Sequence, residues 1–117
     1  MGNPFVHVEL STTDLGKAKP FYQKLFDWTL EDIPGGYTMI NVGNGTGGGM
    51  MKSMSPGIPS HWMAYVLVDD VAASLKKAKS LGAEISMEAT DVMGHGTMGI
   101  FKDPTGAHLA VWKPKMK

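Results

Sequence analysis

The sequence contains no cysteine among its 117 residues. Disulfide bonds, thiolate metal sites and thiol nucleophiles are therefore excluded. An excess of charge of one sign is also lacking, because eleven basic side chains balance eleven acidic ones. Proteins that bind nucleic acid usually carry a basic stripe, so a nucleic-acid partner is not expected.

Two further absences concern location. A membrane-spanning helix requires about 20 apolar residues, and no apolar run in the sequence approaches this length,. The N-terminus also lacks the charged region followed by an apolar stretch that is typical of a secretory signal peptide,. We therefore expect a cytoplasmic protein without a membrane partner. Methionine, by contrast, is abundant, and its ten copies indicate an adaptable apolar lining,.

The first half of the chain predicts a strand, a helix and three further strands. Apolar and polar residues alternate over 5–11, and apolar residues recur at helical spacing from Asp14 to Leu25,. Pro20 in this helix predicts either a kink or a helix whose regular part begins at the proline. The further strands are expected at 28–32, 37–42 and 48–53,.

The second half of the chain repeats this order. Prolines and a glycine predict a linker over 54–60, and Gly82 predicts the end of a helix,. The elements expected after the linker are a strand at 61–68, a helix at 70–81 and strands at 83–88, 96–102 and 107–113,. We therefore expect one α+β domain over 1–117, made of two modules at 1–53 and 61–117.

Residue identities support a duplication of one unit. An offset of 56 places Asp14 on Asp70, each at the expected start of a helix. An offset of 59 pairs identical residues in and between the last two strands: Thr38 with Thr97, Met39 with Met98, Thr46 with Thr105, and Gly47 with Gly106. The shared order of elements and turns favours duplication over chance.

Two features carry possible chemistry. Residues 43–48 match the glycine pattern of a dinucleotide site, but a strand is expected next, whereas that site needs a helix,. A turn is the better interpretation. His7 and Glu9 share one face of the first strand, where they could contribute to a metal site or to general base chemistry. The alternative is a polar rim, or a histidine that is hydrogen-bonded inside a cleft.

Several short motifs occur in a specific order along nearly the whole chain. They are His7-Val-Glu-Leu, Phe21-Tyr22-x-x-Leu25-Phe26-x-Trp28, His61-Trp-Met-Ala-Tyr-Val-Leu-Val-Asp, Lys79-x-Leu81-Gly82-Ala83 and Asp103-Pro-Thr-Gly-Ala-His-Leu. Together they resemble the vicinal oxygen chelate superfamily, which includes glyoxalases, bleomycin-resistance proteins and extradiol dioxygenases. The resemblance implies two tandem βαβββ modules that form a cup-shaped, partly open β-barrel with helices outside, usually in a homodimer.

The resemblance also implies four metal-ligand positions, on the first and last strand of each module. They correspond to His7, Met51, Met63 and Ala110, so only His7 keeps a ligand type. A single imidazole cannot compete with hydration for a hard divalent ion, and thioethers are soft ligands. We therefore expect no cofactor. A divalent metal held by His7, Glu9 and His61 is the alternative.

The expected function is that of a metal-free small-molecule-binding protein of this superfamily. The residues expected around a small organic ligand in the cup are His7, Glu9, Met51, His61, Met63, Tyr65, His108, Ala110 and Trp112,. The methionines could instead simply fill the space of a lost metal. The rival hypothesis is a lyase or isomerase that uses His7 and Glu9, with or without a metal. The identity of the ligand, and whether one chain or two form the cup, stay open.

Overall fold

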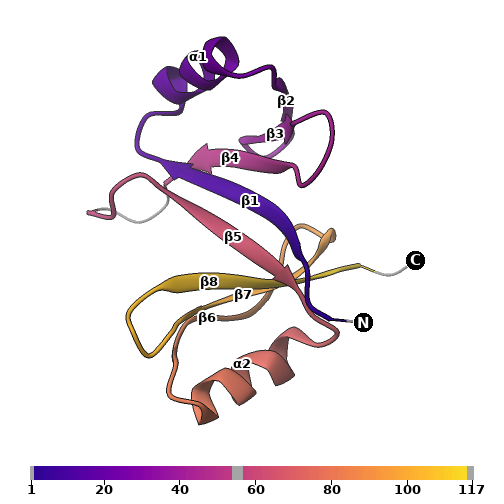
Figure 1. Cartoon of the computed structure of the whole chain (residues 1–117), viewed down its shortest axis with the longest axis vertical. Coiled ribbons are helices and arrows are strands. Elements are labelled where there is room, and N and C mark those ends of the chain that lie inside the picture. Colours follow the sequence, from indigo (N-terminus) through magenta and orange to yellow (C-terminus); the bar gives the residue numbers. More distant parts are fainter. Residues whose placement is uncertain (1, 54–56, 116–117) are drawn as a thin grey trace. The chain divides into compact units, whose positions relative to one another are not determined.

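The computed structural model describes residues 2–53 and 57–115, so part of the predicted linker, 54–56, lies outside the described residues. A strand, a helix and three strands are followed by the same series (Figure 1). The elements are β1 (Phe5–Thr12), α1 (Leu15–Leu25), β2 (Thr29–Ile33), β3 (Tyr37–Asn41), β4 (Gly48–Lys52), β5 (His61–Leu67), α2 (Val71–Ser80), β6 (Glu84–Asp91), β7 (Gly96–Lys102) and β8 (His108–Pro114). The predicted α+β class and the order of elements are confirmed.

The chain divides into two compact units. Residues 6–63 form the first unit, and residues up to 5 together with those from 64 onward form the second. β1 and β5 each run across a boundary, because Phe5 belongs to the second unit and 61–63 belong to the first. Each unit holds a run of four strands and has its own core.

The first unit contains an open sheet with the strand order β2-β3-β4-β1. β1 and β4 run parallel, and the other neighbours run antiparallel. One face of the sheet carries the buried residues Leu10, Ile40 and Met50, against which Leu15 and Ala18 of α1 pack. Alternation along β1 therefore separates an apolar face under α1 from a face that no helix of this unit covers.

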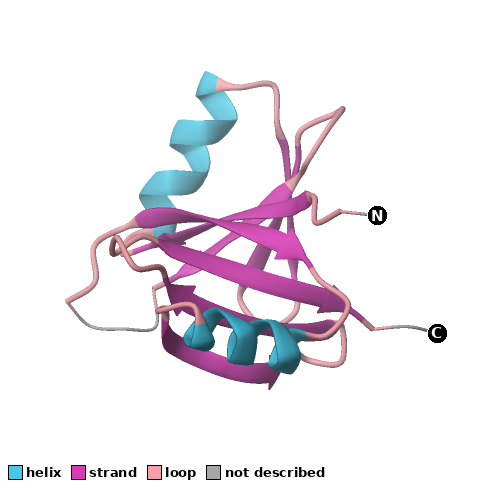
Figure 2. Cartoon of the chain, turned by 60° about the horizontal axis from the view of Figure 1, so that its bottom comes forward, coloured by secondary structure: helices cyan, strands magenta, loops and turns pink. Residues whose placement is uncertain are grey.

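The second unit repeats this plan with the strand order β5-β8-β7-β6. Its core consists of Val71 and Leu75 from α2 and Val111 from β8. Gly99 in β7 lies directly against Leu75, since a Cβ atom at Gly99 would come within 2.5 Å of the Leu75 Cδ1 atom. A glycine in the strand interior thus lets the helix approach the sheet closely. Figure 2 shows α2 lying along the strands.

The two helices differ in how deeply they pack. Asp14 caps α1 by accepting from the Lys17 amide at 3.1 Å, and Asp70 caps α2 by accepting from the Ala73 amide at 3.0 Å,. α1 has no fully buried residue. The helix begins at Leu15 and continues through Pro20, so the expectation that Pro20 opens its regular part is wrong. Neither helix in the described ranges is long and apolar enough to cross a membrane.

Strand register refines the correspondence between the two halves. Glu9 pairs with Gly49, and Tyr65, which lies 56 positions after Glu9, pairs with Ala110. By register, Ala110 therefore corresponds to Gly49 rather than to Met51. The offset of 59 is wrong by two residues for the last strands. Because side chains alternate between faces with a period of two, a shift of two residues does not change the face of the strand on which a side chain lies.

The two leucines of α2 and its C-cap provide a test of this packing. Leu75 is 2% exposed and Leu81 is 70% exposed. We expect Leu75→Ala to lower the free energy of unfolding by about 2–5 kcal/mol, because it leaves a cavity in the second core. Leu81→Ala is the matched control and should change the free energy by less than about 0.5 kcal/mol. Urea unfolding followed by circular dichroism measures both; equal effects would contradict the burial of Leu75.

Candidate functional site

The face of the first sheet opposite α1 carries the polar side chains predicted from β1. His7 and Glu9 alternate with the core-facing residues of β1. Register places Met51 beside Ser11 of β1 and opposite Tyr37 of β3. His7, Glu9, Tyr37 and Met51 therefore share one face of one sheet, within residues 6–63.

His7 is hydrogen-bonded to Tyr37. The distance from His7 Nε2 to the Tyr37 hydroxyl oxygen is 2.7 Å, and the two rings lie at 21° to each other. These residues come from β1 and β3, which are separated by β4. Tyr37 reaches across β4 over Gly49, where a Cβ atom would overlap the tyrosine ring. Glycine at position 49 is therefore required for the contact.

Sequence reasoning missed Tyr37. A strand glycine that permits a close approach was the available signal, since glycine weakens a strand and marks such contacts. The predicted turn is present, because Gly43 and Gly45 have positive φ angles of 93° and 103°. Gly49, however, follows the turn inside β4, and its role is to make room for a side chain.

Burial and charge act in opposite directions on His7. Partial burial lowers the pKa of His7, because the charged imidazolium loses hydration,. The nearby Glu9 carboxylate raises the pKa, but burial is the larger effect. His7 is therefore neutral at neutral pH, and its ring can exchange a hydrogen bond with the Tyr37 hydroxyl.

The other predicted residues fall in different surroundings. His61 begins β5, and its Nδ1 donates to the Pro59 carbonyl oxygen at 2.9 Å. Met63 follows it two residues later on the same strand. In the second unit, Tyr65 is buried, donates from its hydroxyl to the Met98 sulfur at 3.8 Å and meets the Trp112 ring edge-on. There, Ala110 is buried and His108 is exposed at the start of β8.

The donor chemistry does not fit the divalent-metal site that the fold family implies. Of the four corresponding positions, only His7 offers a nitrogen or oxygen donor, and its Nε2 bonds to Tyr37. Strand register makes Gly49, rather than Met51, the counterpart of Ala110, and a glycine offers no side-chain ligand either. Among residues 2–53 and 57–115, no three His, Asp or Glu side chains gather as a possible metal site, so His7, Glu9 and His61 do not form the alternative trio.

Two βαβββ units with open sheets define the class of protein. A sequence model of the Glyoxalase/Bleomycin resistance protein/Dioxygenase superfamily matches residues 5–111. The chain therefore belongs to this superfamily, as its motifs predict.

Sequence relatives share more residues with the chain than structural relatives do. The "Putative glyoxylase CFP32" of Mycobacterium tuberculosis is 38% identical over 115 residues, covering 91% of this chain and 44% of that protein. The anthracycline biosynthesis protein DnrV of Streptomyces peucetius is 29% identical over 123 residues, covering 90% of this chain and 45% of that protein. The chain thus spans less than half the length of these relatives.

Solved structures support the same fold. A hypothetical protein from Bacillus halodurans matches with a TM-score of 0.71 at 15% identity, covering 100% of this chain and 98% of that one. Methylmalonyl-CoA epimerase from Mycobacterium tuberculosis matches with a TM-score of 0.68 at 16% identity, covering 96% and 88%. At such identities these matches establish the fold alone.

His7 provides a pH-dependent test of the site. We expect its NMR titration midpoint to lie below the ordinary histidine value of about 6.5. The folded state then binds this proton less tightly than the unfolded state, so the stabilisation is present above about pH 6.5 and is lost as pH falls through the folded pKa,. Titration of the imidazole Cε1 proton, assigned with His7→Gln, measures the midpoint.

The carboxylate of Glu9 supplies the companion variant. Glu9→Gln should lower the pKa of His7 further, because it removes the charge that opposes burial,. Glu31→Gln on β2 is the matched control and should leave the midpoint unchanged. A His7 midpoint at or above about 6.5 in the unaltered protein would contradict this account.

Proposed function

We propose that this chain is a metal-independent small-molecule-binding member of the superfamily, with its ligand held against the sheet face that carries His7. The hydrogen bond of 2.7 Å between His7 Nε2 and the Tyr37 hydroxyl is the observation that supports this most strongly. The histidine that corresponds to a metal ligand is thereby partnered within the protein. Its neutral ring becomes a hydrogen-bonding group rather than the first ligand of an ion.

The surrounding chemistry supports an organic ligand. His7 and Glu9 are polar, whereas Met51 offers an adaptable apolar contact beside Tyr37,. An apolar surface with a few polar groups is typical of small-molecule sites. The names of the relatives, "Putative glyoxylase CFP32" and anthracycline biosynthesis protein DnrV, both refer to chemistry on small organic molecules. His61 and Met63, which belong to the same unit, are part of this proposal as further ligand contacts. The expectation for Tyr65, His108, Ala110 and Trp112 of the second unit stays a prediction.

A homodimer in the cytoplasm completes the proposal. The dimer is implied by the resemblance to the superfamily, and the location by the sequence composition. Neither is needed for the metal-independent chemistry of His7.

Metal analysis tests the proposal directly. Protein purified without a histidine tag and incubated with Mn²⁺, Ni²⁺ or Zn²⁺ should retain less than one tenth of an equivalent after gel filtration, because three ligand positions lack donors,. Inductively coupled plasma mass spectrometry measures the content. One equivalent that disappears in His7→Ala, while His95→Ala retains it, would overturn the proposal.

A lyase or isomerase reaction is the second candidate, and the neutral state of His7 favours it. A neutral imidazole can take a proton from carbon next to a substrate carbonyl, and the Glu9 carboxylate would stabilise the resulting imidazolium,. The Tyr37 hydroxyl could then donate a hydrogen bond to the substrate oxygen,. In this reaction the carbon–hydrogen bond breaks, the proton moves to the imidazole, and the electron pair of the bond moves toward the carbonyl oxygen to form an enolate.

An assay with methylglyoxal and glutathione separates the two candidates. The binding proposal predicts no S-lactoylglutathione above the uncatalysed rate, with or without added Mg²⁺, Ni²⁺ or Zn²⁺. Metal-independent turnover that falls at least 100-fold in His7→Ala, and less in Glu9→Gln, would instead establish general base catalysis. Turnover that depends on metal and on His7 would contradict both accounts of this site.

A further inference from the structure

A pocket of about 320 Å³ lies within the first unit, on the face of the sheet that α1 covers. Its walls include Val8 of β1 and Ile40 of β3, whose parity is opposite to that of His7 and Tyr37. The pocket therefore lies across the sheet from the site proposed above. All of its lining residues belong to 6–63, so it is complete within this unit.

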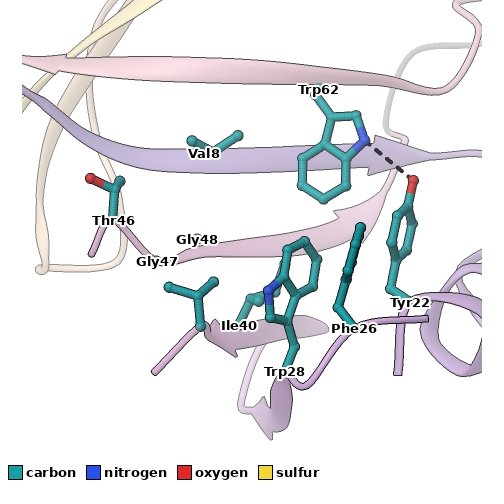
Figure 3. Close-up of a pocket in the computed structure, with 10 residues that line it drawn as sticks. Val8, Tyr22, Phe26, Trp28, Ile40, Thr46, Gly47, Gly48 and Trp62 are labelled. Carbon is teal, nitrogen blue, oxygen red and sulfur yellow. Dashed lines mark hydrogen bonds between the residues drawn. The ribbon is translucent and has the colours of Figure 1, made fainter. Parts of the chain in front are cut away.

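Aromatic rings dominate the lining. Figure 3 shows Trp62, Trp28, Phe26 and Tyr22 at one end of the pocket, with Val8 toward the other end. None of the lining residues is charged. An ionised ligand would therefore lose hydration without meeting an opposite charge, which disfavours anions and cations alike.

The ring geometry gives two walls at a right angle. Tyr22 and Trp28 are nearly parallel, at 20° with centroids 5.9 Å apart. The Trp62 ring stands at 85° to Tyr22 and at 76° to Trp28. The rings contact one another and do not enclose a space, unlike the aromatic cages that bind quaternary ammonium groups. This corner suits a flat ring that stacks on one wall and presents its edge to the other.

The floor of the pocket is bare backbone. Gly47 and Gly48 both line it. Gly48 approaches β1 so closely that a Cβ atom would overlap the Val8 carbonyl oxygen, and a Cβ atom at Gly47 would lie 2.9 Å from the Ile40 carbonyl oxygen. The approach of the strands therefore keeps side chains out of this floor and leaves a surface that a planar molecule can cover.

Two hydrogen-bond donors remain at the rings. The Tyr22 hydroxyl accepts from the Trp62 indole N–H at 3.3 Å, which leaves its own proton to donate. In the part of the chain that the structure describes, the Trp28 indole N–H has no hydrogen-bond partner. In Figure 3 this nitrogen lies on the side of the ring toward Ile40. Both donors match an oxygen acceptor on the ligand.

We propose that this pocket binds an uncharged, planar aromatic molecule of two or three rings that carries a carbonyl or ether oxygen. Ligand pockets have volumes of about 300–1,000 Å³, and this pocket lies at the small end of that range, which limits the ligand to two or three rings,. This proposal does not depend on the one for the His7 face, because the two sites share no lining residue.

Coumarin is the probe, because it is planar and uncharged and carries a carbonyl oxygen. We expect it to shift the indole N–H signals of Trp28 and Trp62 in ¹H–¹⁵N NMR spectra of the full chain. Trp112, the third tryptophan, belongs to the second unit and is the internal control. Unshifted signals at Trp28 and Trp62, or an equal shift at Trp112, would overturn the proposal.

Phe21 within α1 and Phe26 at its C-cap give a matched pair of variants. Phe26 lines the pocket and is 46% exposed, whereas Phe21 is 58% exposed and lies outside the lining. Phe26→Ala should weaken coumarin binding three- to tenfold, in keeping with the loss of one aromatic contact. Phe21→Ala should change it less than twofold. Their exposure keeps the folding cost of both small, which far-ultraviolet circular dichroism checks; equal binding by both variants would count against the pocket.

Two analogues test the ligand class. Octahydrocoumarin has the same skeleton without aromatic rings, and coumarin-3-carboxylate adds a charge; each should bind at least tenfold more weakly than coumarin. Equal binding of either would refute the planar or the uncharged part of the proposal. If a second copy of the chain occupies the pocket instead, the Trp28 and Trp62 signals will change with protein concentration and coumarin will have no effect, which also overturns it.

Discussion

The close approach of β4 to its two neighbours is the constraint on which the first unit depends. It rests on three consecutive glycines, Gly47, Gly48 and Gly49, where an added Cβ atom would meet the Ile40 backbone, the Val8 backbone and the Tyr37 ring respectively. One backbone approach thus permits the parallel pairing with β1, the floor of the aromatic pocket and the contact from Tyr37 to His7. A side chain at Gly48 would collide with β1, whereas one at Gly49 would collide with Tyr37 on the opposite face of the sheet,.

Much of the fold could be predicted from the sequence because alternation and helical spacing report local structure directly. β7 has the predicted bounds of 96–102, and β1 begins at the predicted Phe5 but ends one residue later than predicted, at Thr12,. The capping aspartates Asp14 and Asp70 lie at the predicted starts of the two helices,. Register between strands is not local. Ala110 corresponds to Gly49 and not to Met51, two residues away from the predicted position. This correspondence depends on how β5 pairs with β8, and the residue pattern within one strand does not encode it,.

The candidate site shows the same limit. Parity along β1 indicates that His7 and Glu9 share a face, and this follows from one strand alone. The partner of His7 comes from β3 and reaches it across β4. Predicting this contact requires the register of β4 with both β1 and β3, and the absence of a side chain at Gly49. The sequence motif that contains Tyr22, Phe26 and Trp28 was visible, but their gathering with Trp62 of β5 requires the tertiary fold.

The hydrogen bond of His7 matters because the other positions that correspond to metal ligands, Met51, Met63 and Ala110, offer no nitrogen or oxygen donor. A histidine that has lost the other ligands of its ion is a half-buried polar group, and such a group costs free energy unless it is hydrogen-bonded. Tyr37 supplies that bond, and Gly49 gives it room. Burial then keeps the imidazole neutral despite Glu9, so the ring can accept or donate a hydrogen bond. The proposed function follows from this balance, because a neutral, hydrogen-bonded imidazole suits a neutral or weakly polar organic molecule better than a cation.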